Sequence, residues 1–196
     1  HPVSELRVVL LGNSWSGRSS VGNFILGEPV FNTDEEPNNC LRIGGQLKEG
    51  KIFLINTPDL LNPNISEDKL REHVELCVRL SVPGPHVFLL VLQPEDFTEE
   101  HRLRLCRVLE RFSDQSFDHS MVLMSKPKQK SPASRDFNIH QAPLQEMISI
   151  CGFRSLKQED LELRELLKNF KQIVEKNHGN HVMCHQLTIK HKEESV

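Results

Sequence analysis

The sequence lacks several features that would place it in a specialised class of protein. It has no tyrosine and one tryptophan. Its cysteines form no pair of the C-x-x-C type, so neither a disulfide framework nor a paired-cysteine zinc site is indicated. Its longest unbroken apolar run, Val87 to Leu92, is far too short to span a bilayer. The formal net charge of −3 combines residues of both signs, which argues against nucleic acid or an anionic membrane as a partner.

These absences leave the composition of a globular domain. A chain of 196 residues is long enough for one domain that buries roughly 70% of its unfolded surface. No charged leader precedes the first apolar run, which argues against a signal peptide. The scattered cysteines predict reduced thiols that mostly serve as packing residues, and hence a cytoplasmic protein. They are Cys40, Cys77, Cys106, Cys151 and Cys184.

Short apolar runs alternate with longer stretches of helical period, which predicts an α/β fold around a mostly parallel sheet. Strands covered on both faces are rich in Val, Ile, Leu and Phe throughout, as are Leu6–Leu11, Lys51–Asn56, Val87–Leu92 and Ser120–Met124. A more exposed strand, Leu41–Leu47, is expected to pair antiparallel with the second of these. The expected helices are Ser19–Leu26, Ser66–Leu80, Thr98–Phe112, Pro143–Cys151 and Gln158–Asn177.

The most informative short stretch is GNSWSGRSS, Gly12 to Ser20, which directly follows the first predicted strand. Its spacing is that of a phosphate-binding loop, G-x-x-x-x-G-K-[ST], in which backbone N–H groups and a helix N-terminus attract an anion. Arg18 stands where this pattern has lysine, and a planar guanidinium is not equivalent to an ammonium at so tight a site. Ser19 offers a hydroxyl to Mg²⁺. The alternative interpretation is a glycine turn that merely joins strand to helix.

Two longer motifs indicate a family. GPHVFLLVLQPEDFTEEH, residues 84–101, resembles the characteristic box of the immunity-associated GTPases, the GIMAP family. GRSSVGNFILGEPVF, residues 17–31, resembles that family's extended phosphate loop, and INTPDLL at 55–61 and CGF at 151–153 match in order. The resemblance implies a Ras-like P-loop G domain of the septin-related branch, with an extra helix around the box, that binds guanine nucleotide and associates through its nucleotide face.

The resemblance covers the chain from about Leu6 to His181. Residues 1–5 are therefore interpreted as an N-terminal extension or an expression remnant, 6–181 as the G domain, and 182–196 as a C-terminal tail that is frayed or disordered from Lys190. His178, His181, Cys184 and His185 have spacings compatible with zinc. The preferred interpretation of this cluster is a helix end followed by an exposed tail.

The sequence departs from the family pattern at the phosphate and metal positions. Besides Arg18, the uncharged Asn56 replaces the aspartate that holds Mg²⁺ through water in the family. Phosphoryl transfer without a well-held metal is slow. The loop ahead of Cys40 has no neighbouring hydroxyl for the metal, and Thr33 is the nearest one. Trp15 lies inside the phosphate loop, where its ring could cover a ligand or partner or pack on the neighbouring loop.

The base-binding positions also differ. Ser125-Lys126-Pro127-Lys128-Gln129 follows the fourth strand without the carboxylate that selects guanine, and Asp136 is far along the loop. Without such a carboxylate, a preference of about 10⁴ for the correct base is lost. The segment Phe153 to Gln158, including Lys157, lacks the family's paired asparagines. The sequence therefore predicts that nucleotide binding is weak or absent while the fold is retained.

The candidate nucleotide-binding residues are Gly12, Asn13, Ser14, Ser16, Gly17, Arg18, Ser19, Ser20, Asn56, Ser125 and Lys126. Ser19 is the candidate Mg²⁺ ligand, and no catalytic residue is assigned. The prediction is a degenerate guanine-nucleotide-binding module that hydrolyses GTP slowly or not at all, binds GTP, GDP and Mg²⁺ weakly, and acts through protein partners or a homo-oligomer formed at the nucleotide face. Two alternatives stay open: a divergent but functional GTP-binding switch with slow hydrolysis, and a structural subunit of a larger chain.

Overall fold

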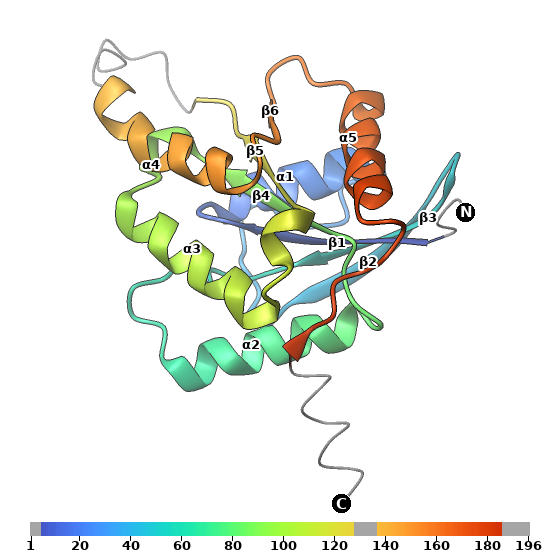
Figure 1. The fold of residues 1–196 in the computed structure, drawn as a ribbon, viewed down its shortest axis with the longest axis horizontal. Coiled ribbons are helices and arrows are strands. Elements are labelled where there is room, and N and C mark those ends of the chain that lie inside the picture. Colours follow the sequence, from blue (N-terminus) through green and yellow to red (C-terminus); the bar gives the residue numbers. More distant parts are fainter. Residues whose placement is uncertain (1–4, 128–136, 186–196) are drawn as a thin grey trace, which may run out of the picture.

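The computed structural model describes residues 5–127 and 137–185, which form three layers (Figure 1). A six-stranded sheet in the order β2-β3-β1-β4-β5-β6 lies between two layers of helices. Its strands are β1 (Glu5–Gly12), β2 (Leu41–Leu47), β3 (Gly50–Asn56), β4 (Val87–Leu92), β5 (Ser120–Met124) and β6 (Ser155–Lys157). The helices are α1 (Trp15–Leu26), α2 (Glu67–Leu80), α3 (Glu99–Phe112), α4 (Phe137–Ile150) and α5 (Leu163–Lys176).

Each central strand is buried on both faces because its successive side chains enter different cores. In β1, Val9 and Leu11 pack with α2, α3 and α4, whereas Val8 and Leu10 pack with α1 and α5. All six residues of β4 are buried in the same alternating way. This arrangement explains why these strands have continuous apolar sequences.

The strand order places the phosphate-loop segment at the point where the sheet changes direction. β1 pairs in parallel with β3 on one side and with β4 on the other. The carboxyl ends of these parallel strands share one edge of the sheet, where open α/β sheets bind ligands. The connection from β1 to α1, which starts at Gly12, lies at this switch point. The antiparallel pairing predicted for β2 with β3 is confirmed.

Most elements predicted from the sequence are confirmed to within one or two residues. The four central strands and β2 are present, and α2 and α3 begin after the predicted caps, Ser66 and Thr98. The Thr98 hydroxyl accepts from the backbone N–H of His101, whose ring accepts from the Thr98 N–H. Within the family box, a short 3-10 helix, η1 (Pro94–Asp96), separates β4 from α3. A second one, η2 (Ser116–His119), precedes β5.

Three helix starts and one strand differ from the prediction. α1 begins at Trp15 instead of Ser19, and α4 begins at Phe137, so that Pro143 lies inside it. α5 begins at Leu163 instead of Gln158, because a turn closed by the bond from the Leu161 N–H to the Gln158 carbonyl follows β6, and Glu162, the N-cap, has extended backbone angles. β6 has only three half-exposed or exposed residues, too few to show a strand period in the sequence.

The segment after α5 returns to the core, so the prediction of an exposed tail is wrong for its first residues. Val182 and Cys184 are buried among the residues of α2 and α3, and the Val182 N–H donates to the Pro85 carbonyl at 2.8 Å. Residues 190–196 of the predicted frayed tail lie outside the described residues. None of the five cysteines, all of which lie in the described ranges, forms a disulfide, and all but Cys106 are buried, which confirms that they mostly serve as packing residues. In the described ranges no helix is long and apolar enough to cross a membrane.

Candidate phosphate-loop site

The predicted site residues gather at the carboxyl edge of the sheet. Gly12 ends β1, Asn56 ends β3, Ser125 follows β5, and Ser14 to Ser19 form the start of α1. Ser19 and Arg18 are buried, whereas Ser16 and Ser20 are exposed. In the structure, Gly12 and Ser19, the two ends of the predicted loop, both lie near Asn56. Ser20 lies at the surface.

The loop is shorter than the motif predicts because Ser14 caps α1. Ser14 has extended backbone angles, and its hydroxyl accepts from the Gly17 N–H at 3.2 Å. The Ser14 carbonyl accepts from the Arg18 N–H at 3.0 Å. Serine is among the best N-cap residues because its oxygen satisfies a free amide of the first turn. Two of the amides expected to face a phosphate are therefore already bonded within the helix start.

Close packing against β4 fixes the first residues of the loop. A Cβ atom on Gly12 would lie 1.9 Å from the Val91 carbonyl oxygen, so only glycine fits. The Asn13 side chain accepts from the Gln93 N–H at 2.8 Å and donates to the Gln93 carbonyl at 3.2 Å. Sequence reasoning missed this pair because its two partners are 80 residues apart.

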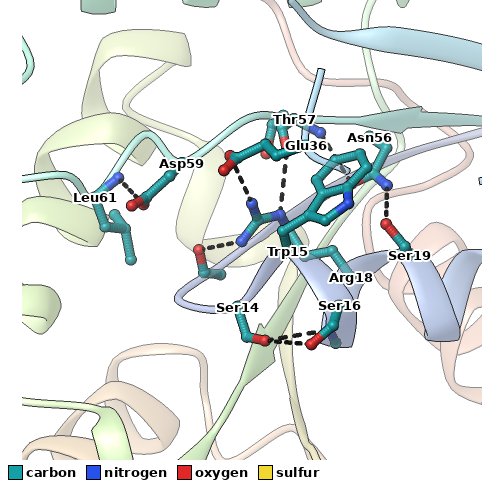
Figure 2. A network of polar contacts seen from close by, with 12 residues as sticks. Ser14, Trp15, Ser16, Arg18, Ser19, Glu36, Asn56, Thr57, Asp59 and Leu61 are labelled. Atoms are coloured by element: carbon teal, nitrogen blue, oxygen red, sulfur yellow. Dashed lines mark hydrogen bonds and ion pairs between the residues drawn. The ribbon is translucent and has the colours of Figure 1, made fainter. Parts of the chain in front are cut away.

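Arg18 is fully buried and turned inward (Figure 2). Its Nη1 donates to the Gly12 carbonyl at 2.6 Å, and its Nε donates to the Thr57 carbonyl at 3.2 Å. The guanidinium thereby joins the ends of β1 and β3 through their main chain. Arginine is almost never fully buried without a partner, and here main-chain oxygens supply part of that partnership.

The third nitrogen of this guanidinium has a different environment. Nη2 lies 3.7 Å from a carboxylate oxygen of Glu36, in the loop between α1 and β2, and it has no hydrogen-bond partner within the described ranges. Burial lowers the pKa of Arg18 to about 10, and Glu36 and Asp59 oppose this decrease. The side chain therefore stays cationic at neutral pH. Glu36 was not a predicted site residue; its only sequence signal was its place in an acidic loop.

The metal corner, where Asn56 meets Ser19 at the position at which the family binds Mg²⁺, carries an amide in place of a carboxylate. The Asn56 Oδ1 accepts from the Thr57 N–H at 3.0 Å, which directs its Nδ2 at the Ser19 hydroxyl oxygen, 3.4 Å away (Figure 2). Because an N–H donor points at this oxygen, one of its two lone pairs is engaged by a hydrogen, and the Asn56 amide adds no negative charge that would attract a cation. Thr57 adds a hydroxyl bond to the Leu10 carbonyl. Thr33, the alternative hydroxyl, is exposed.

Ser125 and Lys126 form the opposite end of the site. The Ser125 hydroxyl is buried without a hydrogen-bond partner in the described part of the chain, 3.2 Å from where a Cβ on Gly17 would be. The Lys126 carbonyl accepts from the Gln93 side chain at 3.0 Å, and the Lys126 side chain is exposed. A cavity of about 230 Å³ lies beside them, bounded also by Leu144 and Lys157. Lys128 and Asp136 lie outside the described residues.

Two other sequence hypotheses have structural answers. The Trp15 ring is half-buried, its Nε1 donates to the Asn32 carbonyl at 2.8 Å, and its ring centroid is 5.7 Å from the Arg18 guanidinium carbon. It therefore packs on the neighbouring loop, as the second interpretation proposed. No group of three or more His, Cys, Asp or Glu side chains suited to a metal occurs among residues 5–127 and 142–185.

The site fits an anion better than it fits a magnesium ion. An unbonded guanidinium nitrogen and an unbonded hydroxyl, both buried, are donors that a phosphate and a base edge would satisfy. The Asn56 and Ser19 pair offers no negative charge, and Mg²⁺ in proteins is usually held by carboxylates. The residues present therefore fit phosphate and do not fit a protein-held Mg²⁺ at this corner.

The fold and the loop together define a P-loop G domain. The sequence pattern of the AIG1 family matches residues 6–196, and the chain belongs to this family, that of the immunity-associated GTPases. It is 28% identical over 191 residues to the human GTPase IMAP family member 8, covering 90% of this chain and 29% of that protein. It is 26% identical to immune-associated nucleotide-binding protein 1 of Arabidopsis thaliana, covering 91% of this chain and 87% of that one.

The chain thus spans less than a third of the human relative. Solved structures show the same fold at low identity. One match is a structure of the chloroplast translocon components atToc33 and psToc159, for which dimerization is described as important for GTPase activity. Its TM-score is 0.70 at 13% identity, over 93% of this chain and 86% of the other. Toc33 from Arabidopsis thaliana in complex with GDP and Mg²⁺ matches with a TM-score of 0.64 and 13% identity, over 87% and 84%.

Proposed function

We propose that this chain is a degenerate guanine-nucleotide-binding module. It binds GTP or GDP weakly and without a well-held Mg²⁺, hydrolyses GTP slowly or not at all, and acts through contacts with protein partners or a second copy of itself. GTP is the nucleotide because the chain belongs to a family of GTPases. The weakness is argued from this chain's own residues.

The observation that carries the proposal is the contact between Asn56 and Ser19. The Thr57 N–H fixes the orientation of the Asn56 amide, so its NH₂ group faces the Ser19 hydroxyl. A bound Mg²⁺ would supply the charge that bridges and neutralises the terminal phosphates of GTP. Asn56 and Ser19 offer that ion no negative charge. Charge developing on the transferred phosphoryl group is therefore poorly stabilised.

Arg18 adds a second obstacle to turnover. The P-loop lysine contacts the terminal phosphates directly in functional NTPases, whereas Arg18 donates two of its bonds to the Gly12 and Thr57 carbonyls. Breaking these bonds to reach a phosphate would leave two main-chain oxygens without their donors, which costs free energy. The arginine is thereby used for structure at the expense of catalysis.

The relatives support an assembly role. Dimerization is described as important for the GTPase activity of atToc33 and psToc159, which share this fold. A G domain that has lost turnover can still present the same face to a partner, because its sheet and helices are intact. We propose the nucleotide face as the surface through which this chain binds a partner or a second copy.

Isothermal titration of the nucleotide-stripped chain with GTP, GDP and ATP, each with Mg²⁺ and with EDTA, tests this proposal. We expect dissociation constants weaker than about 100 μM, unchanged by Mg²⁺ and equal for GTP and ATP, because both the metal carboxylate and the base carboxylate are missing. Micromolar or tighter binding of GTP that EDTA abolishes would refute it.

A functional switch with slow hydrolysis is the second candidate. The buried, unbonded Arg18 Nη2 and Ser125 Oγ favour it, because they are free donors at the two ends of the site. Under this alternative, guanine nucleotide copurifies with the chain and is released on denaturation. It is absent from Gly17→Val, since a side chain at position 17 would crowd the Ser125 hydroxyl and Ser14.

A further inference from the structure

Glu36 faces the guanidinium nitrogen that a phosphate would otherwise contact. Its carboxylate lies 3.7 Å from Arg18 Nη2, which is beyond hydrogen-bond distance, while the other two nitrogens of the guanidinium are bonded to main-chain carbonyls (Figure 2). Glu36 is 37% exposed, whereas Arg18 is buried. A partly solvated ion pair without a hydrogen bond is weak. It can therefore be exchanged for another anion.

The segment that carries Glu36 is fixed at its two ends. Phe31 is buried, and its backbone bonds twice to the Asn23 side chain, at 2.8 and 3.0 Å. Cys40 is buried, and its thiol lies 3.6 Å from the His73 carbonyl. Between these anchors, residues 32–36 are exposed. A displacement of residues 32–39 would therefore leave the core contacts of Phe31 and Cys40 in place.

Two contacts hold this segment against the start of α1. One is the ion pair of Glu36 with Arg18, and the other is the bond from the Trp15 indole to the Asn32 carbonyl. Asn32 also orders the turn before Glu36, because its Oδ1 accepts from the N–H groups of Asp34 and Glu35 at 2.8 and 3.1 Å. Of these two contacts, displacement of Glu36 would leave the one made by Trp15.

We propose that Glu36 is an internal competitor of phosphate: it neutralises Arg18 and holds residues 32–39 closed over the start of α1, and a diphosphate group that binds Arg18 displaces it and releases this segment. The ligand is a diphosphate, free or as part of a nucleotide, and it binds without a divalent cation. The proposal rests on the weak, metal-free site argued above and adds a regulatory contact to it. Release changes the acidic surface, Asp34 to Glu36, that a protein partner would meet.

Trp15 gives a direct optical test. It is the only tryptophan in a chain without tyrosine, and it contacts both the closing segment and Arg18. Its fluorescence is recorded while pyrophosphate, GDP or ADP is added in EDTA to the wild-type chain, Glu36→Gln and Glu35→Gln. Glu35→Gln is the matched control because it removes the same charge from the neighbouring exposed residue. Pyrophosphate alone reports free diphosphate, and GDP against ADP reports any contribution of the base.

We expect Glu36→Gln to bind pyrophosphate with a Kd about three- to five-fold lower than the wild type, and Glu35→Gln to stay within about two-fold. Hydrogen exchange should show faster exchange at residues 32–39 in free Glu36→Gln and in the wild type with pyrophosphate. Equal affinities of the two variants, or no binding to either at millimolar pyrophosphate, would overturn the proposal. Mg²⁺-dependent turnover would overturn the proposed function instead, and the comparison in EDTA would still decide the role of Glu36.

Discussion

Replacing Asn56 with aspartate tests the metal corner with the smallest structural change. The two side chains have the same shape, and Asn56 is fully buried at the end of β3. Without a cation, the new carboxylate keeps the Thr57 N–H as a donor, and the Ser19 hydroxyl can turn to donate to it. Burial of a charge that is only partly compensated still costs free energy. We expect a loss of about 2 kcal/mol in the free energy of unfolding in EDTA.

Magnesium should restore part of this loss in Asn56→Asp only. At ten times its Kd, a ligand of the folded state adds RT ln 11, about 1.4 kcal/mol, which raises Tm by about 3–6 °C for a domain of this size. Thermal melting with 10 mM Mg²⁺ or EDTA measures the shift. Asn13→Asp is the control, because it adds the same charge to the same loop beside Gln93 instead of Ser19. An equal Mg²⁺ shift in the wild type or in Asn13→Asp would refute the reasoning.

Three further predictions address the fold around the site. Gly12→Ala should destabilise the chain by more than about 3 kcal/mol in urea denaturation, because its Cβ would meet the Val91 carbonyl. The control, Gly27→Ala, has open space around the new Cβ but a φ of +70°, and should cost only about 1 kcal/mol. Equal losses of stability in the two variants would contradict this account. His86 is buried, and burial lowers its pKa to about 3, with further contributions from the nearby Arg7, His181 and His119. As the pH falls below about 6.5, His86 is therefore protonated in the unfolded chain but not in the folded one. The free energy of unfolding should fall by about 2 kcal/mol from pH 7 to pH 5. His86→Asn should lose less over this range in parallel urea titrations, with the remainder due to His119 and His73, whose pKa values burial also lowers; an unchanged pH dependence would count against the role of His86. Glu67 on α2 pairs with Arg107 and Arg111 on α3 at the surface. Glu67→Gln should therefore lower the free energy of unfolding by less than about 1 kcal/mol, and by less still in 0.5 M salt. A larger loss that does not depend on salt would show that this contact is not a screened surface pair.

The sheet could be predicted because its signal is local. β1, β3, β4 and β5 are covered on both faces, so each appears as a short continuous apolar run. β6 could not be predicted, since three residues with mixed exposure carry no period. The spacing of the phosphate loop predicts the start of α1 four residues late, at Ser19, because the hydroxyl that caps the helix belongs to Ser14, inside the predicted loop.

The chemistry of the site was predictable only in part. The changes at Arg18 and Asn56 are visible in the sequence, because a motif fixes which residue each position should hold. Where those side chains point depends on partners far along the chain: Thr57 is 39 residues from Arg18, and Gln93 is 80 from Asn13. Glu36 is closer, but no periodicity links it to Arg18. Such contacts follow from the packed fold and leave no pattern in a single sequence.

The release of phosphate from GTP by the purified chain, in the presence of 5–10 mM Mg²⁺, tests the central claim most directly. Because the Asn56 amide lies where a Mg²⁺ ligand would be needed and Arg18 is bonded to main-chain carbonyls, we predict slow release or none, at a rate that neither EDTA nor Arg18→Ala lowers. Steady release of phosphate that Arg18→Ala and EDTA both abolish would contradict the account.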